Sequence, residues 1–281
     1  MRMNRYTFWG ISKSTLIHIF LMSVALTCLA PILWMLRCSF MTNATVFVDK
    51  GLIPHDLNVN NFAIAWTKGN FAAYFLNSVI YTVCVVGGIV VISSLAAFSF
   101  SRLKFPGKDI IFYIFIAAMM VPLPGSFVAL FVIMKNLGLV NSRFGYILCM
   151  INVGLSMSIL LLKTFFDKLP RDLEDAAHID GCGKLGIWWH VALPLARPAI
   201  AVIVIFNSLN VWNEYILAFL LLGDSQLMPL QRGLMVFQGA NSTDYPVLMA
   251  GLTMAAVPIV LIYLAMQKHI VKGLSSGALV G

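Results

Sequence analysis

Four polar side chains lie within an otherwise apolar stretch in the second half of the chain. Asn207, Asn210 and Glu214 follow the spacing i, i+3, i+7, which places them on one face of a helix, and Asn213 lies beside them. A carboxylate with neighbouring amides can hydrogen-bond another helix or a polar solute. Such groups are costly in apolar surroundings. We therefore expect this face to line a wet pathway or its outer gate, to bond a partner helix, or to contact a substrate directly.

A second cluster lies in a charged stretch of residues 163–197. Pro170 is followed by acidic residues, which is typical of the first turn of a helix. Leu173, Ala176 and Ala177 then form a narrow face of small and apolar side chains, and a glycine after them permits a sharp bend. We predict a short helix, a turn and a second short helix. The small-residue face could accept another protein closely, and a simple connector is the alternative.

The sequence contains no complete set of residues with the spacing of a catalytic or metal site. Glu174 and His178, or Asp175 and His178, have the spacing of helical metal ligands, but no third ligand or second Glu-x-x-His accompanies them. The phosphate-binding pattern G-x-x-x-x-G-K-[ST] is absent. The cysteines show no C-x-x-C spacing. We expect no catalytic residue, no metal site and no cofactor in this chain.

The composition restricts the class of protein. Apolar residues make up 60% of the 281 residues and charged residues 11%, against about 45–50% and about 25% in soluble domains. So few charges exclude a soluble enzyme and a nucleic-acid-binding domain, and so many apolar residues exclude a disordered chain. The sequence predicts an integral membrane protein.

Windows without charged residues predict six membrane-spanning helices, because about 20 apolar residues cross the hydrocarbon core and lipid leaves no partner for an open strand edge. The fold class is therefore all-α and polytopic, with one transmembrane domain over residues 1–281. Pro122 and Pro124 should break the third span. The predicted spans are residues 14–36, 73–101, 110–134, 144–162, 198–222 and 246–267.

The distribution of basic residues predicts the orientation. With the N-terminus inside, thirteen of the nineteen Lys and Arg residues fall in the inner segments. Both termini and the loop of residues 163–197 are therefore expected in the cytoplasm. The outer segment of residues 41–68 is expected to be a loop with at most a short amphipathic helix.

The loop resembles the EAA loop of the inner-membrane permeases of binding-protein-dependent ABC importers. The family pattern is Glu-Ala-Ala, three residues, Gly, nine residues, Ile, any residue, Leu-Pro. Asp replaces Glu here and Val replaces Ile. Because Asp is one methylene shorter, the ion pair attributed to that Glu in the family is either weakened or moved to Glu174. The matching positions are Asp175, Ala176, Ala177, Gly181, Val191, Leu193 and Pro194.

The resemblance extends over nearly the whole chain and is specific to the maltose-type permeases, which form the second, six-helix subunit of a heterodimeric pore. In that branch a basic residue often precedes the final Gly, and Val280 departs from this pattern. The matching segments are residues 77–78, 100–107, 137–139, 212–215, 229–234 and 272–281.

This resemblance implies a mechanism and a set of partners. Two ATPase subunits bind ATP and Mg, a second permease completes the pore, and an extracytoplasmic solute-binding protein delivers a carbohydrate or related polyol. The location is the bacterial cytoplasmic (inner) membrane, and nucleic acid is not a partner. A permease for a non-sugar solute and a secondary transporter are the alternatives. The residues expected to couple to the ATPase are Glu174, Asp175, Ala176, Ala177, Gly181, Leu193 and Pro194.

Overall fold

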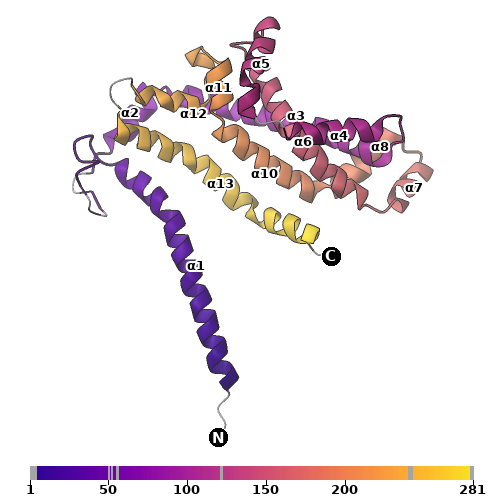
Figure 1. The fold of residues 1–281 in the computed structure, drawn as a ribbon, viewed down its shortest axis with the longest axis horizontal. Helices are drawn as coiled ribbons and strands as arrows, with labels where there is room; N and C mark the ends of the chain where they lie inside the picture. Colours follow the sequence, from indigo (N-terminus) through magenta and orange to yellow (C-terminus); the bar gives the residue numbers. More distant parts are fainter. Residues whose placement is uncertain are drawn as a thin grey trace. The chain divides into compact units, whose positions relative to one another are not determined.

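The computed structural model describes residues 5–278, apart from residues 50, 52, 55, 56, 121, 122 and 240–242, with side-chain surroundings for residues 14–264 outside these gaps and residues 123–124. The described chain is helical, with a single isolated β-bridge between Gln238 and Thr243 (Figure 1). The predicted all-α fold is thus confirmed.

Long apolar helices account for most of the predicted spans. In the described residues, four helices contain a stretch long and apolar enough to cross a membrane, and a fifth arises if a bent helix pair is counted as one span. In that pair, residues 184–195 meet α10 (Arg197–Asn213) at an angle of 77°. The count of six spans therefore stays a prediction. The four long helices are α1 (Arg5–Cys38), α3 (Phe71–Arg102), α6 (Arg143–Asp167) and α13 (Tyr245–Ala278).

The predicted third span is interrupted. It consists of α4 (Lys108–Ala118) and α5 (Leu123–Asn136), and neither is long enough to cross a membrane alone. A break at this place was expected from the prolines, which lack the backbone N–H that a continuous helix requires. Pro122 itself lies outside the described residues.

Two predicted boundaries are corrected by the structure. The fourth helix, α6, continues to Asp167, so the loop that follows is shorter than expected. The fifth span is not one helix over residues 198–222: α10 ends at Asn213, and a separate helix, α11 (Ile216–Leu221), begins after two non-helical residues.

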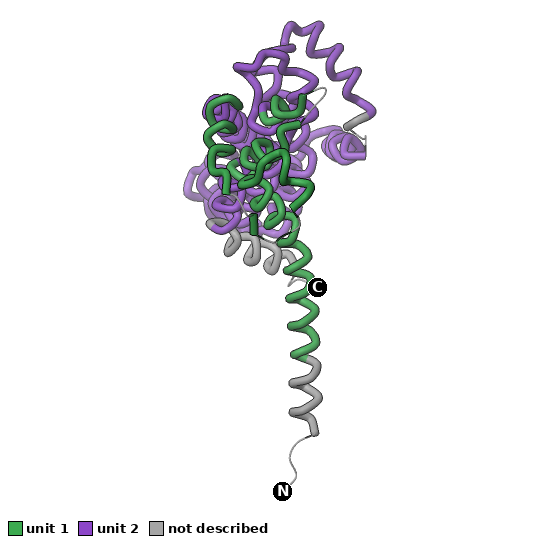
Figure 2. The backbone as a smooth tube through the Cα atoms, turned by 90° about the vertical axis from the view of Figure 1, so that its left-hand side faces the viewer, with its two compact units in different colours: residues 1–69, 234–254 green, residues 70–233, 255–281 purple. Residues whose placement is uncertain are grey.

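The chain divides into two compact units (Figure 2). The first unit comprises residues 1–69 and 234–254, with α1, α2 (Asn60–Lys68), the 3₁₀ turn η3 (Leu234–Phe237) and the first part of α13. Within it, the Asn61 amide donates to the backbone oxygens of Ser39 and Met41 at 2.8 and 2.7 Å. The helix α2 confirms the short helix expected in the segment of residues 41–68.

The second unit comprises residues 70–233 and 255–281. Its centre is the packing of α3 against α6 and α10, where the buried rings of Tyr81 and Tyr146 meet edge to face at 4.7 Å. The remaining elements of this unit are α7 (Asp172–Ile179), α8 (Lys184–Ile187), a π-helical turn η1 (Trp188–Ala192), α9 (Leu193–Leu195), the 3₁₀ turn η2 (Ser225–Leu227) and α12 (Leu230–Gly233).

Candidate functional site

The helix α7 forms where the sequence predicted it, after α6 and before α10 along the chain, and it lies near one end of the helices of its unit in Figure 1. Its end is closed by two backbone hydrogen bonds, from Gly181 to the oxygen of His178 at 3.1 Å and from Cys182 to that of Ala177 at 2.9 Å. This pairing is the Schellman motif, in which the residue after the cap adopts a left-handed conformation. Gly181 has φ +83°, so the predicted bend is confirmed.

The two faces of α7 have different surroundings. Ala177 is 9% exposed and packs in the chain's own core, and the Glu174 side chain is 19% exposed. Asp175 and Ala176 are exposed. The expectation that Ala176 and Ala177 share one open face was therefore wrong, because the helix must bury one stripe against its own chain to stay attached to it.

Glu174 forms an ion pair with a residue far away in the sequence. Its carboxylate lies 2.5 Å from Nε of Arg102, the last residue of α3. The other end of the guanidinium donates to the backbone oxygen of Leu169 at 2.7 Å. With its side chain 7% exposed, Arg102 is well shielded from water, so its charge interacts strongly with that carboxylate. Arg102 thereby fastens α7 to the end of α3.

The neighbouring end of α6 is joined to α3 in the same region. Asp167 accepts hydrogen bonds from Ser101 at 2.6 Å and from Lys163 at 2.7 Å. Sequence reasoning missed these contacts, since Arg102 and Lys163 had served only as evidence of orientation. The ends of α3 and α6 and the start of α7 thus form one bonded group.

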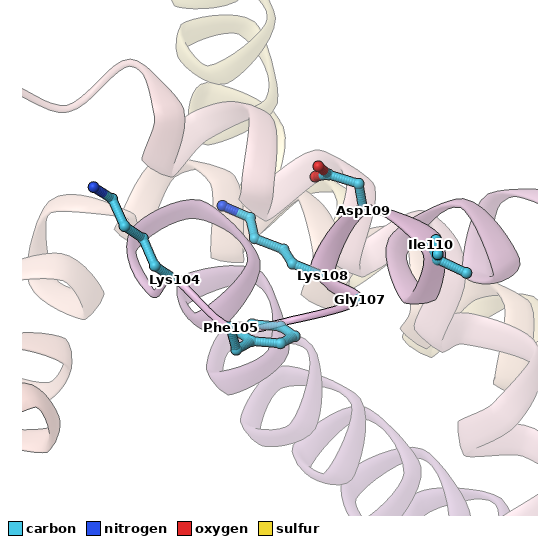
Figure 3. Close-up of a pocket in the computed structure, with 6 residues that line it drawn as sticks. All are labelled: Lys104, Phe105, Gly107, Lys108, Asp109 and Ile110. Carbon is cyan, nitrogen blue, oxygen red and sulfur yellow. The ribbon is translucent and has the colours of Figure 1, made fainter.

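The two lysines that follow Arg102 in the sequence do not take part in this group of contacts. Lys104 and Lys108 lie in the turn from α3 to α4, at a cavity of about 350 Å³ shown in Figure 3. Neither forms an ion pair with any residue that the structure describes. Of these three basic residues, it is Arg102, at the end of α3, that pairs with α7 in the described part of the chain.

The second half of the loop leads into the membrane helix α10. Residues 184–195 are continuously helical through the π-helical turn, and Leu193 and Pro194 lie at the end of this stretch. The chain then bends by 77° into α10. Ala192 and Ala196, beside the bend, are 1% and 0% exposed, so the corner is packed tightly. Movement of α8 and α9 would therefore act directly on α10.

Glu214 does not share a helix face with Asn207 and Asn210, contrary to the expectation. It follows the end of α10 in an extended conformation with ψ 130°. Its carboxylate accepts hydrogen bonds from the backbone N–H groups of Leu217 at 2.6 Å and Ala218 at 3.0 Å. The carboxylate therefore caps the positive N-terminal end of α11. Because α10 ends at Asn213, Glu214 lies one residue beyond the helix and is not on the face that carries Asn207 and Asn210.

A tyrosine completes the surroundings of this carboxylate. The hydroxyl of Tyr146, on α6, donates to Glu214 at 3.1 Å, and the Tyr146 side chain is fully buried. Glu214 thus connects α6, α10 and α11. An aromatic residue in an apolar helix carries no sequence signal for such a bond, so Tyr146 was missed.

Asn207 bonds a neighbouring helix. Its amide donates to Oγ of Ser158 on α6 at 3.2 Å and to the backbone oxygen of Ile203 at 2.9 Å. A Cβ at Gly154 would collide with the Asn207 amide, so this contact requires glycine. The sequence signal that could have predicted this contact is the spacing of Gly154 and Ser158, because small residues four apart allow two helices to approach closely.

Asn210 and Asn213 are both exposed but differ in their hydrogen bonding. The Asn213 amide donates to the backbone oxygen of Leu209 at 2.8 Å. Asn210 has no hydrogen-bond partner in the part of the chain described, and it borders a cavity of about 290 Å³ between α6 and α10. Of the four predicted residues, Asn207 and Asn210 are brought together at this cavity.

Metal binding receives no support where the structure is described. Across those residues, no group of three or more His, Cys, Asp or Glu side chains could hold a metal ion.

Comparison with known proteins decides the family. Residues 88–276 match the family described as "Binding-protein-dependent transport system inner membrane component". The chain belongs to this family. The match includes α7, the residues of the predicted coupling loop and α10, so the resemblance seen in the sequence is confirmed.

Relatives of this permease match over nearly their full lengths. The probable ABC transporter permease protein YurM of Bacillus subtilis is 33% identical over 97% of this chain and 90% of its own. The diacetylchitobiose uptake system permease protein NgcG of Streptomyces coelicolor is 33% identical over 92% of this chain and 87% of its own. In a crystal structure of a bacterial ABC transporter involved in the import of the acidic polysaccharide alginate, one chain is 26% identical with a TM-score of 0.78, covering 95% of this chain and 99% of that one.

Family membership settles the general role. The chain is a multi-pass inner-membrane permease of a binding-protein-dependent ABC importer, as predicted, and not itself an enzyme. Permeases of this family carry no cofactor of their own. An ATPase and a binding protein are the partners that membership implies.

Proposed function

We propose that this permease imports a carbohydrate, driven by ATPase subunits that dock on the outward face of α7. The observation that carries this proposal is the division of α7 into two faces. Glu174 and Ala177 hold the helix on its own chain, whereas Asp175 and Ala176 are exposed. A helix that is attached to its own chain on one side and exposed on the other can bind a partner and transmit the partner's movement to α3.

Asp175 and Ala176 are proposed to meet the ATPase directly. Because the Glu174 carboxylate is paired with Arg102, the exposed Asp175 is the acid of the matching Asp-Ala-Ala pattern that is free to pair with a partner. Ala176 permits close approach, and the neighbouring Ile179 is 87% exposed, an apolar contact that a partner could cover. Gly181 keeps the bend, while Leu193 and Pro194 pass movement to α10. Ala177 positions the helix.

A six-span topology with both termini in the cytoplasm is proposed from the basic residues of the inner segments. In this arrangement α4 and α5 together form one interrupted crossing, and α10 continues through α11 in another. Broken helices are tolerated at membrane depth where protein or water satisfies the freed backbone groups. The capping of α11 by Glu214 supports this for the second break.

The assembly is proposed to contain a second permease, two ATPase subunits that bind ATP and Mg, and an extracytoplasmic solute-binding protein. Residues 1–281 would act as one permease domain, which is supported by the matching of relatives over nearly the whole chain. The exposed apolar surface of α1, including Phe20 at 66% and Leu16 at 63%, is suited to lipid or to the second permease.

The substrate is proposed to be a saccharide, because relatives are named for diacetylchitobiose uptake and alginate import. Asn207 and Asn210, at the cavity between α6 and α10, are assigned to the pathway, with Asn213 and Glu214 at its outer end. A non-sugar solute would replace the saccharide in this proposal if its test fails.

The test is purification of the tagged chain from its own bacterium, followed by reconstitution. We expect a second permease and an ATPase to copurify, and the vesicles to take up diacetylchitobiose, maltose or trehalose in the presence of ATP and the binding protein. Uptake without ATPase or ATP would contradict the proposed coupling of import to ATP hydrolysis. ATP-driven complexes that take up none of these sugars but a different solute would overturn the saccharide assignment alone.

A further inference from the structure

The cavity between α6 and α10 carries features of a small-ligand site. Its volume is about 290 Å³, close to the lower end of the range of about 300–1,000 Å³ found for ligand pockets. Such a volume holds one ring rather than an oligosaccharide. The residues that line it include Gly154, Met157, Ser158, Phe206, Asn207 and Asn210, together with four aliphatic side chains.

One amide in this cavity is available to a ligand. The Asn207 amide nitrogen and the Ser158 hydroxyl are engaged with each other and with backbone oxygens. Asn210 is exposed and has no hydrogen-bond partner among the described residues. An asparagine amide both donates and accepts, which is the combination that a pair of neighbouring sugar hydroxyls requires.

An aromatic ring lies one helical turn from this amide. Phe206 is 61% exposed, and its position four residues before Asn210 places both side chains on the same face of α10. Met157, on α6, is 55% exposed at the same cavity. The C–H groups on one face of a pyranose ring can pack on the ring of Phe206 while the hydroxyls at its edge reach Asn210.

The charge of the lining selects among possible ligands. The residues that border the cavity carry no charged group. An acidic sugar such as a uronate would lose water there without gaining a cation, whereas a neutral ring loses only hydrogen bonds, some of which Asn210 can replace. A lipid acyl chain is disfavoured too, because it would leave the Asn210 amide unpaired.

We propose that this cavity is a binding subsite for one neutral pyranose ring, with Phe206 stacking on the ring and Asn210 bonding its hydroxyls. The inference rests on the proposed import of a saccharide and adds the residues that contact it and the exclusion of acidic sugars. It assigns sugar contact to this permease subunit in addition to whatever the second permease provides.

Binding is tested in the complete purified complex with Phe206→Trp as a fluorescent reporter that keeps an aromatic face. Diacetylchitobiose, maltose and trehalose are titrated without binding protein, and the signal of the parental complex is subtracted. At least one of these sugars should change the emission, and glucuronate should not. Adding Asn210→Ala should raise the dissociation constant about fivefold, as expected for one lost hydrogen bond. Asn136→Ala, at an exposed asparagine on α5, is the matched control and should leave the constant unchanged.

Transport gives a second readout that a structural role would not produce. With saturating binding protein, Asn210→Ala and Phe206→Ala should lower the amount of sugar moved per ATP hydrolysed, while Phe144→Ala, at an exposed ring on α6, should not. Parallel losses of uptake and ATPase activity would indicate a structural defect and contradict the proposal.

Three results would overturn the subsite. Loss of the second permease from Asn210→Ala complexes would assign the cavity to the subunit interface. Quenching of the Phe206→Trp emission by brominated acyl chains, without a response to sugar, would assign it to lipid. Parental uptake in both variants, with no sugar-dependent emission, would remove the subsite and leave the proposed import function intact.

Discussion

Arg102, at the end of α3, and Glu174, in the first turn of α7, form an ion pair at 2.5 Å with both side chains largely shielded from water. The same arginine donates to the backbone oxygen of Leu169, directly before α7. A membrane helix and the loop helix that follows α6 are therefore joined by one side chain with two contacts. If the ATPase moves α7, this arginine carries the movement to α3.

Arg102→Glu should uncouple the importer. The change places two carboxylates together and removes a hydrogen-bonded charge, which weakens the attachment of α7 by about 2–3 kcal/mol. Uptake should fall more than ATP hydrolysis in reconstituted complexes. The exchange Arg102→Glu with Glu174→Arg should recover part of the coupling, whereas Lys104→Glu, at an exposed and unpaired position, should be tolerated. No recovery in the exchanged pair, together with normal coupling in Arg102→Glu, would contradict the role of this contact.

The two alanines of α7 should respond differently to the same enlargement. Ala176→Trp adds a ring to the exposed face, so the loop should fold normally but retain the ATPase poorly. Ala177→Trp overpacks a buried position and should destabilise the loop by about 1–3 kcal/mol. Thermal unfolding of the solubilised permease and ATPase retention separate these effects. Equal retention of ATPase in Ala176→Trp and the parental complex would exclude this face as the docking site.

Gly181 and Gly183 provide a matched pair for the bend after α7. Neither would bring a new Cβ within 4 Å of another atom, but Gly181 has φ +83° and Gly183 has φ −74°. Gly181→Ala should therefore impair coupling through backbone strain of about 1–2 kcal/mol, whereas the same change at Gly183 should be neutral. Binding-protein-stimulated ATP hydrolysis and uptake are the measurements. Similar behaviour of both variants would mean that the left-handed bend is not required.

Glu214→Gln should lower transport more than assembly. Glutamine keeps one oxygen for the N–H groups of α11, but loses the negative charge and the second acceptor. A charge at a helix terminus contributes about 0.3–1 kcal/mol, and up to about 2 kcal/mol where it is partly buried. Tyr146→Phe, which removes one bond to the same carboxylate, should have a smaller effect. Parental uptake by a normally assembled Glu214→Gln complex would assign the residue to packing alone.

Cysteine labelling should establish the orientation. After replacement of all five native cysteines, including Cys182 in the same loop as Lys184, single cysteines are introduced at the exposed positions Asn60 and Lys184. An impermeant maleimide should label Asn60→Cys from outside the cell and Lys184→Cys only in inverted vesicles. Labelling of both from the same side would reject the proposed topology.

Local sequence pattern was sufficient to predict most of the long helices and the helix α7 with its bend. Charge-free windows located the long helices, since backbone groups exposed to lipid have to be satisfied within an apolar helix. The acidic start of α7 and the glycine bend at Gly181 were also predicted, because helix caps depend on residues within one turn. The family pattern of the loop predicted that it contacts an ATPase, which stays a prediction.

Tertiary structure decided which side chains act together. Asp175 and Glu174 are adjacent acids in the sequence, yet Glu174 faces Arg102 and Asp175 faces outward, because the packing of Ala177 sets the rotation of α7. Glu214 does not share a helix face with Asn207 and Asn210, because its carboxylate caps α11 instead. Helical spacing in the sequence does not show whether a residue continues one helix or caps the next. The partners Ser158 and Tyr146 come from a different helix, and their proximity depends on the packing of α6 against α10, which a linear pattern does not contain.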